Sequence, residues 1–236
     1  MNTTTSSYQW KIVDKKVETP TVTSLYLEPI SEKPNFIAGQ YVTIQIPNIG
    51  PAEGKSYSIS NAPHEAQLRI SIKKMGNFST AILNHQLGDT IFTSAPYGFF
   101  YPEPIDTNEL VFVVGGIGIA PCLSIIKHLA HTNNPRPIKL FYSNKTTVEI
   151  AFKKELDTIA QDHPQLSLNY YLTQEETVNT DCITGRVTPE QIVSSLDNKA
   201  EAEIFICGAM DFTKSLWKGL HNAGLPQHQL YTEGFF

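Results

Sequence analysis

Residues 110–121 read LVFVVGGIGIAP, and this stretch decides the fold. Its first five residues are continuously apolar, which is typical of a strand buried on both faces of a parallel sheet. Glycines follow at positions 115, 116 and 118, and Pro121 suits the first turn of a helix, where its missing N–H costs nothing. The stretch therefore predicts a strand, a tight turn and a helix start. A pyrophosphate or a nicotinamide could approach the backbone of such a turn closely.

Downstream of this turn, apolar strands alternate with helical segments. We expect strands at residues 138–142, 166–172, 204–207 and 230–232, and helices at 120–130, 150–159, 189–196 and 212–223. This alternation predicts a doubly wound parallel sheet over residues 109–236. The turn departs from the common dinucleotide fingerprint, because Pro121 stands where a third Gly or Ala is expected and no acidic residue lies about 20 residues further on. A tight turn without a ligand is the alternative.

Upstream of the turn, short segments alternate between apolar and polar residues. We expect strands at 10–14, 22–27, 41–46, 57–60, 68–72 and 90–93, with one helix-like interruption at 79–87. Short strands at this regular spacing predict a closed six-stranded antiparallel β-barrel over residues 1–104. The polar, proline-bearing segment 101–108 is the expected connector between the two domains.

Composition narrows the functional class. Of the 236 residues, 41% are hydrophobic and 17% are charged, so a substantial core is expected, and the net charge of −5 argues against a nucleic-acid partner. The three cysteines are too widely spaced for a disulfide framework or a metal site, and the histidines show no ligand spacing. Residues 110–126 carry no charge, but their glycines and proline would break a membrane-spanning helix. With no apolar signal core at the N-terminus, we expect a cytoplasmic protein without membrane insertion.

A second motif carries a family resemblance. Residues 55–61 read KSYSISN and place a cation, an aromatic ring and small hydroxyls along a strand. Together with the glycine turn, this motif resembles those of the ferredoxin–NADP reductase family of flavoenzymes. AGQYV at 38–42, PYGFF at 96–100, Cys207-Gly208 and EGFF at 233–236 are similar to further motifs of that family. The resemblance covers nearly the whole chain and implies an FAD-binding barrel followed by an NAD(P)-binding domain.

The resemblance also implies roles for single residues. Tyr57 is expected to pack on the isoalloxazine ring of non-covalently bound FAD, with the Ser58 hydroxyl near flavin N5. Lys55 is expected to face the flavin phosphates, where the family usually has arginine, so phosphate binding loses the bidentate fork. The helix start at residues 76–79 is expected to hold the FAD pyrophosphate, although Asn77 or Ser79 could simply cap that helix. The further cofactor-binding residues expected are Ile72, Lys74, Gly76, Asn77, Phe78, Ser79, Gly115, Gly116, Ile117, Gly118, Pro121, Thr173, Gln174, Cys207 and Gly208.

Three residues are predicted to be catalytic. Cys207 is expected beside the nicotinamide, close to where hydride leaves C4, and Glu233 is expected at the flavin face, with Ser58 near N5. Phe235 or Phe236 is expected to stack on the flavin until nicotinamide displaces it. Without the resemblance, Cys207 would be an ordinary core residue, Glu233 a solvated terminal carboxylate and the phenylalanines a docking contact.

Nucleotide preference and electron acceptor stay open at this point. Thr173-Gln174-Glu175 stands where NADPH users of the family usually have Ser or Thr followed by Arg, which favours NADH, whereas Ser143-Asn144-Lys145 is neutral to basic. Single electrons are expected to pass to a separate molecule, with ferredoxin or flavodoxin as the first choice. The alternatives are the reductase component of a multicomponent oxygenase and a free-flavin or ferric reductase. A different class of function is a non-catalytic flavin-binding subunit, in which Cys207 and Glu233 would be dispensable.

Overall fold

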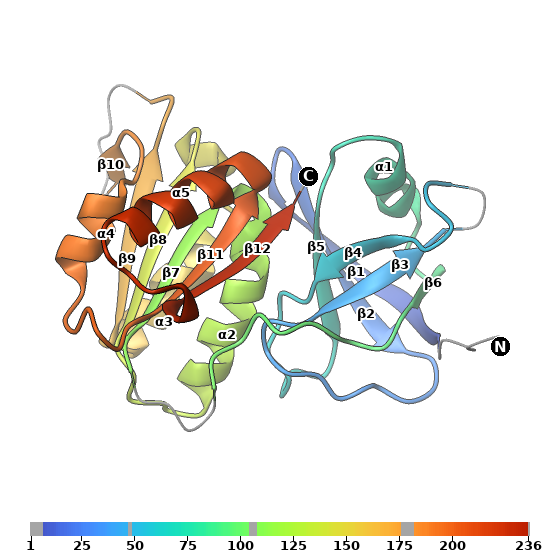
Figure 1. The fold of residues 1–236 in the computed structure, drawn as a ribbon. Helices are drawn as coiled ribbons and strands as arrows, with labels where there is room; N and C mark the ends of the chain where they lie inside the picture. Colours follow the sequence, from blue (N-terminus) through green and yellow to red (C-terminus); the bar gives the residue numbers. More distant parts are fainter. Residues whose placement is uncertain (1–6, 47–48, 104–107, 176–181, 236) are drawn as a thin grey trace, which may run out of the picture. The chain divides into compact units, whose positions relative to one another are not determined.

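The computed structural model describes residues 7–46, 49–103, 108–175 and 182–235 of the chain. It divides into two compact units (Figure 1), of which the first comprises residues 1–101 and 120–128 and the second residues 102–119 and 129–236. The predicted domain boundary falls within residues 104–107, outside the described residues, so the predicted ranges 1–104 and 109–236 stay a prediction.

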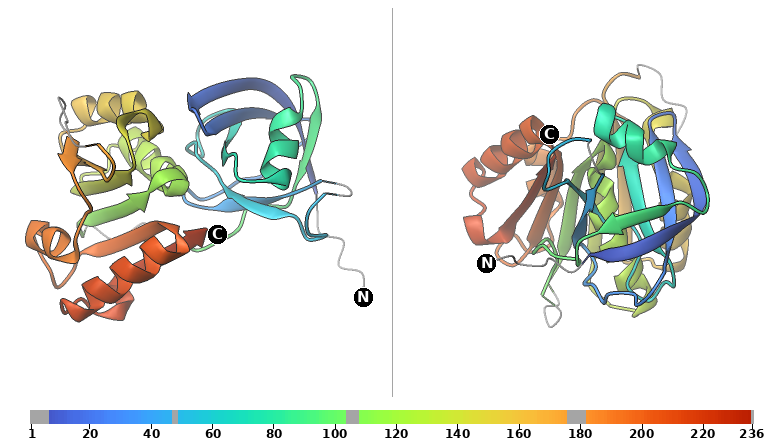
Figure 2. Two further views of the ribbon diagram at one scale, coloured as in Figure 1. Left: turned by 90° about the horizontal axis from the view of Figure 1, so that it is seen from above. Right: turned by 90° about the vertical axis from the view of Figure 1, so that its right-hand side faces the viewer.

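The first unit is an antiparallel barrel, seen from two further sides in Figure 2. Its strands follow the order β4-β3-β6-β1-β2-β5, and every pair is antiparallel. Ile59, just after β4, forms an antiparallel bridge with Ile70 of β5, so the two edges of the sheet meet. The elements are β1 (Tyr8–Thr19), β2 (Val22–Pro29), β3 (Tyr41–Gln45), β4 (Lys55–Ser58), β5 (Leu68–Lys73), α1 (Asn77–Asn84) and β6 (Thr90–Thr93).

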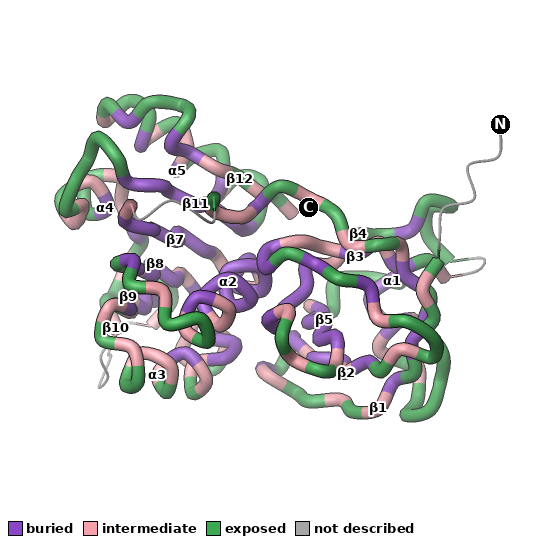
Figure 3. Tube along the Cα trace, turned by 90° about the horizontal axis from the view of Figure 1, so that it is seen from below, coloured by how far each residue is buried: buried purple, intermediate pink, exposed green. Residues whose placement is uncertain are grey.

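Side chains at every second position of the strands point into the barrel and form its core. Along β1, Trp10 and Ile12 are fully buried, whereas Gln9 and Lys11 are exposed. Figure 3 colours the trace by burial, with buried residues in purple. The Trp10 indole N–H donates to the Thr93 hydroxyl at 2.8 Å, which satisfies its one polar atom inside the core. The apolar positions predicted for the first hundred residues therefore form the core of this unit.

The second unit is a parallel sheet with helices on both faces. Its strands follow the order β10-β9-β8-β7-β11-β12, and every pair is parallel. The strand order reverses at β7, between β8 and β11, and such a switch point is where open α/β sheets bind ligands. The elements are β7 (Leu110–Gly115), η1 (Gly116–Gly118), α2 (Ile119–His131), β8 (Ile138–Asn144), η2 (Thr147–Glu149), α3 (Lys153–Asp162), β9 (Leu166–Leu172), β10 (Cys182–Thr184), α4 (Pro189–Ser195), β11 (Glu203–Ala209), α5 (Met210–Asn222), η3 (Gln227–Gln229) and β12 (Leu230–Phe235).

The two faces of this sheet are covered differently. Val111 and Val113 pack in one cluster with Ile192 of α4 and Leu216 of α5. On the opposite face, the Tyr170 hydroxyl of β9 donates to Asp157 of α3 at 2.8 Å. The predicted barrel and the predicted doubly wound sheet are both confirmed. Among the described residues, no helix is long and apolar enough to cross a membrane, and no cluster of three or more His, Cys, Asp or Glu could hold a metal ion.

Two helices differ from their predicted bounds, and the short strand β10 was not predicted. The helix predicted at 150–159 begins only at Lys153, because Phe152 before it adopts a left-handed conformation with φ of 61°. The helix predicted at 79–87 is α1, Asn77–Asn84, and ends earlier because Gly88 N–H already bonds the carbonyl of Ile12 in β1 at 2.8 Å.

Candidate functional site

Strand β4 carries the residues predicted to meet the flavin. Tyr57 lies opposite Val42 of β3 and packs partly buried against the barrel core. Burial raises the pKa of the Tyr57 phenol to about 12, so its hydroxyl is protonated at neutral pH. The Lys55 ammonium lies 5.8 Å from the centre of the Phe78 ring, beside the start of α1. Strand β4 and the start of α1 are thus adjacent, as a shared phosphate site would need.

Ser58 ends β4 with an unsatisfied hydroxyl. Its side chain is buried, and its Oγ has no hydrogen-bond partner among the described residues. A buried hydroxyl without a partner costs about 1–3 kcal/mol, so it calls for an explanation. Ser56, two residues earlier, is exposed and lies 3.2 Å from the Thr43 hydroxyl. Of these two serines, Ser58 is the one whose hydroxyl is buried without a partner among the described residues, as expected of a group that binds a ligand.

The start of α1 is open to an anion. Gly76 precedes the helix with φ of 137°, and no atom lies within 4 Å of the place where a Cβ would stand. The helix has no side-chain cap. The Ser79 hydroxyl accepts from the Met75 N–H at 2.8 Å and donates to the Gly76 carbonyl at 3.1 Å, so it braces the turn instead of capping the helix. This uncapped helix start suits a pyrophosphate.

The other two residues predicted on this side lie at the end of β5. Ile72 is fully buried in the barrel core, so only its backbone is available to a ligand. The Lys74 N–H donates to the Thr21 carbonyl at 2.8 Å, while its side chain is exposed. Lys74 is therefore free to approach a phosphate, and Ile72 contributes shape.

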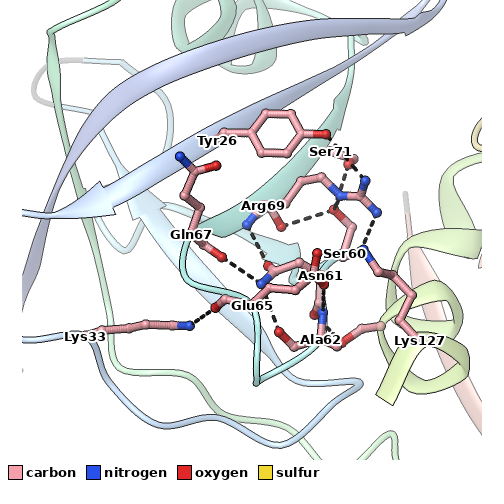
Figure 4. A network of polar contacts seen from close by, with 11 residues as sticks. Tyr26, Lys33, Ser60, Asn61, Ala62, Glu65, Gln67, Arg69, Ser71 and Lys127 are labelled. Carbon is pink, nitrogen blue, oxygen red and sulfur yellow. Dashed lines mark hydrogen bonds and ion pairs between the residues drawn. The ribbon is translucent and has the colours of Figure 1, made fainter. Parts of the chain in front are cut away.

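A buried arginine, which sequence reasoning missed, fixes the segment after β4 (Figure 4). The Arg69 guanidinium donates to the Ser60 carbonyl at 2.7 Å, and its backbone N–H donates to the Asn61 side chain at 2.6 Å. Inside the barrel the Ser60 hydroxyl also lies 2.7 Å from the Ser71 hydroxyl. These bonds hold residues 60 and 61 and, with them, the end of the strand that presents Ser58. The signal in the sequence was a lone charge inside the apolar run LRISI, residues 68–72.

The glycine turn of the second unit packs directly on β11. A Cβ on Gly118 would lie 2.3 Å from the carbonyl oxygen of Cys207, so only glycine permits this contact. Gly116 adopts a left-handed conformation with φ of 52° and faces open space. Gly208 is similarly close to Phe212, at 2.9 Å from a built Cβ. The fold therefore brings the predicted residues 115–118 beside Cys207 and Gly208, with Ile117 half-buried and Pro121 buried in the first turn of α2.

Cys207 and Glu233 lie opposite each other on neighbouring strands. They pair in the register of β11 with β12, and Cys207 is fully buried. Glu233 is half-buried, and its Oε2 is shielded from solvent with no hydrogen-bond partner among the described residues. This burial raises the pKa of the Glu233 carboxyl to about 7. Phe235 follows, half-buried, and the predicted residue Phe236 lies outside the described residues.

The predicted nucleotide residues after β9 are tied to the end of β8. The N–H of Thr173 donates to the Asn144 carbonyl at 3.0 Å, and the N–H of Gln174 donates to the Lys145 carbonyl at 2.9 Å. Both side chains are exposed. This loop and the glycine turn lie along the same carboxyl edge of the sheet.

Comparison with known proteins matches this geometry. The model of the oxidoreductase NAD-binding domain matches residues 112–217. Flavohemoprotein A of Dictyostelium discoideum is 28% identical over 242 residues, covering 95% of this chain and 59% of that protein. Reductase component 1 of terephthalate 1,2-dioxygenase from Comamonas sp. is 27% identical over 229 residues, covering 95% of this chain and 67% of that protein.

A solved structure agrees over the whole length. The ferredoxin NADP+ reductase of Neisseria gonorrhoeae, determined with bound FAD and NADP, superposes with a TM-score of 0.82 at 23% identity, covering 98% of this chain and 99% of that one. The chain therefore contains an oxidoreductase NAD-binding domain and shares the fold of this ferredoxin reductase. It spans about three-fifths of the length of the flavohemoproteins it matches.

Proposed function

We propose that the chain is an NAD(P)H-dependent flavoprotein reductase that binds FAD non-covalently and delivers electrons to a separate redox acceptor. The observation that carries this proposal is the buried Ser58 hydroxyl, which has no partner among the described residues at the position predicted for flavin N5. Bound FAD would supply the redox chemistry, since a flavin accepts a hydride and can release its electrons one at a time.

In this proposal the residues of the barrel bind and orient FAD. The Ser58 hydroxyl would donate a hydrogen bond to a flavin ring nitrogen, and the neutral Tyr57 phenol would offer an aromatic face to the ring. Lys55 and the uncapped start of α1 place positive charge and free N–H groups where phosphates need them. Arg69 does not contact FAD in this proposal but is a positioning residue, because its guanidinium fixes the backbone that follows Ser58.

The sheet residues orient the nucleotide and handle a proton. The glycine turn would admit the nucleotide backbone, and the close contact of Gly118 with the Cys207 carbonyl keeps that turn packed against β11. With a pKa near 7, the Glu233 carboxyl can hold or release a proton at physiological pH. Cys207 itself is a small buried neighbour of that carboxyl, which suits a role in positioning the reacting ring.

The acceptor is part of the proposal. One relative is by name the reductase component of a dioxygenase, which supports a separate redox protein as partner. A ferredoxin, a flavodoxin or an oxygenase component would fill that role. The competing proposal, a flavin-binding subunit without catalysis, predicts that replacing Cys207 or Glu233 leaves nicotinamide-driven flavin reduction unchanged.

An anaerobic titration tests the proposal directly. The purified, FAD-loaded chain is titrated with NADH and with NADPH while its visible flavin bands are recorded. Bleaching by either nucleotide is the expected result. A yellow protein that neither nucleotide bleaches would favour the non-catalytic subunit, and a protein that stays colourless after FAD is supplied would overturn the flavin assignment.

Replacing Ser58 by alanine sharpens the test, because two effects of opposite sign are expected. Without FAD, Ser58→Ala should be more stable than the wild type by about 1 kcal/mol, since it removes an unsatisfied buried hydroxyl. With FAD, the same variant should lose about tenfold to a hundredfold in the rate of flavin reduction, because one preorganised donor is missing.

The matched control is Ser56→Ala, on the same strand but exposed and bonded to Thr43. It should change neither the urea midpoint of unfolding of the apoprotein nor the rate of flavin reduction measured by stopped flow. If Ser58→Ala destabilises the apoprotein and leaves the rate unchanged, the Ser58 hydroxyl has a structural role and the proposal loses its main support.

A further inference from the structure

The first turn of helix α5 lies on the ends of two neighbouring strands of the parallel sheet. The Phe212 ring lies against Gly208 of β11, where a built Cβ would stand 2.9 Å from the ring atom Cδ1. The same ring lies 3.4 Å from the Cβ position of Gly115, the last residue of β7. One aromatic side chain therefore fills the space beside both glycines, and a large residue at either position would displace it.

The Phe212 ring is also held from its other side. It is half-buried and packs against the apolar cluster that contains Ile206 and Leu216. The hydroxyl of the next residue, the buried Thr213, lies 3.5 Å from the Gly208 carbonyl oxygen. Since α5 begins without a side-chain cap, these contacts fix its first turn on β11 instead.

Met210 extends this contact to the next strand. A Cβ on Gly234 of β12 would lie 3.2 Å from the Met210 methyl carbon and 3.3 Å from its sulfur. Gly234 directly follows Glu233 and pairs with Gly208 in the register of β12 with β11. The first turn of α5 thus contacts glycines on three neighbouring strands, β7, β11 and β12.

The contact of Phe212 leads to the residue expected beside nicotinamide. Gly208 directly follows Cys207, and the Cys207 carbonyl oxygen is the atom that a Cβ on Gly118 would approach to 2.3 Å. The ring, the end of β11 and the glycine turn are therefore packed in series. A change in the position of the ring would move the backbone beside Cys207 and, through it, the turn.

In the proposed function, on which this inference rests, nicotinamide lies beside Cys207. We propose that Phe212 is a positioning residue of that site: its ring holds the ends of β7 and β11 in the arrangement that orients nicotinamide for hydride transfer. The ring takes no part in the chemistry. It acts on the rate through geometry, and a misplacement of about 1 Å can slow a reaction about a hundredfold.

Replacing Phe212 by alanine tests the proposal. The full, FAD-loaded chain is mixed anaerobically with the nucleotide that the wild type prefers, and flavin bleaching is followed by stopped flow. We expect Phe212→Ala to lower the limiting rate of flavin reduction about tenfold to a hundredfold. The long-wavelength absorbance that arises when nicotinamide stacks on the flavin should weaken as well. Adenosine 5′-monophosphate, which lacks nicotinamide, should keep its wild-type dissociation constant in calorimetry.

Leu216→Ala is the matched control. Leu216 is buried in the same apolar cluster, one turn of α5 further from the strand ends. Its truncation should lower the urea midpoint of unfolding at least as much as Phe212→Ala does, but should leave the limiting rate and the long-wavelength absorbance unchanged. Phe212→Leu, which keeps an apolar contact with the cluster, replaces Phe212→Ala if that variant does not fold, and it should also slow flavin reduction.

Gly208→Ala approaches the same contact from the strand. Its methyl group would crowd the Phe212 ring, so the limiting rate of flavin reduction should fall. Adding Phe212→Leu to Gly208→Ala should restore part of that rate, because the crowded ring atom is then absent. Two independent structural defects would instead add up in the double variant.

The outcomes separate this proposal from the reductase proposal. Three results would overturn the role of Phe212 and leave the reductase proposal intact: a wild-type rate in Phe212→Ala, an equal loss of rate in Leu216→Ala, or a loss of adenosine 5′-monophosphate binding in Phe212→Ala. A wild type whose flavin neither nucleotide reduces would overturn the reductase proposal, and the role of Phe212 with it.

Discussion

Glu233 and Glu175 lie on the same carboxyl edge of one parallel sheet, and their carboxylates are in opposite states. Glu233 on β12 has a shielded oxygen without a partner among the described residues, and burial raises its pKa to about 7. Glu175 after β9 accepts two hydrogen bonds from Thr147, which lower its pKa. The difference is the supply of donors. The same side chain becomes a group that exchanges a proton near neutrality in one place and a fixed charge in the other.

This contrast bears on the proposed function. There Glu233 would lie toward the nicotinamide, where hydride and protons move, so a carboxyl that titrates near pH 7 would be useful. Glu175 instead keeps its charge at neutral pH, because Thr147 donates two hydrogen bonds to its carboxylate.

The largest effect is expected from breaking the edge itself, with Gly118→Ala. The added Cβ would lie 2.3 Å from the Cys207 carbonyl oxygen, which is backbone and cannot move aside cheaply. We expect a loss of at least about 3 kcal/mol in the free energy of unfolding, measured in urea, together with loss of nucleotide binding.

Gly116→Ala is its control. Gly116 has φ of 52° and open space around the Cβ position, so alanine there should cost only about 1 kcal/mol of backbone strain. Equal stability of the two variants would mean that the turn does not pack on β11 as described.

The next effect concerns Glu233 and pH. Its pKa rises from an ordinary 4.5 to about 7 on folding, so the folded state binds more protons between these values. Stability should therefore fall as pH rises from about 4.5 to 7, and the whole loss should be present above pH 7. Glu233→Gln should remove this pH dependence. At pH 8 its free energy of unfolding should exceed that of the wild type by about 2 kcal/mol, which is less than the full pKa shift would give because the side chain is only half-buried.

The measurement is a set of urea unfolding curves between pH 4.5 and 8. Glu149→Gln, which changes the same charge on a carboxyl at the other end of the edge, should keep the wild-type slope. A Glu233→Gln variant with the wild-type pH profile would show that the carboxyl is not desolvated in the folded protein.

Much of this arrangement could be predicted from the sequence, because it depends on local patterns. The strand predicted at 166–172 has these bounds in the structure, and the glycine turn followed from three glycines after an apolar run. Contacts between distant residues could not be predicted in this way. The pair of Thr147 with Glu175 and the bond from Arg69 to Ser60 depend on the register of strands, and no local pattern encodes it.

Which side chains are buried was the other feature that the sequence alone did not predict. The motif around Ser58 suggested a hydroxyl near a flavin, but only the folded chain shows that this hydroxyl is buried while Ser56 stays exposed. The short strand β10, Cys182–Thr184, has no period of its own and exists because β9 offers it a partner edge. In both cases tertiary context supplies what propensity does not.

The smallest effect sharpens the comparison at Glu175. Thr147→Val removes the hydroxyl donor, which contributes most to the lowered pKa of Glu175, and keeps the backbone N–H. NMR titration of the side-chain carboxyl should show the Glu175 pKa moving part of the way back to its ordinary value, with the Glu233 pKa unchanged. A lowered pKa contributes stability that is present above the ordinary value and is lost as pH falls through the folded-state pKa. In the variant this contribution should therefore be smaller, and its loss should be complete at a higher pH. Thr146→Val, next in the chain, is the control that should move neither group. If the Glu175 pKa stays low in Thr147→Val, something other than the Thr147 hydroxyl lowers it, and the supply of donors does not explain the difference between the two carboxylates.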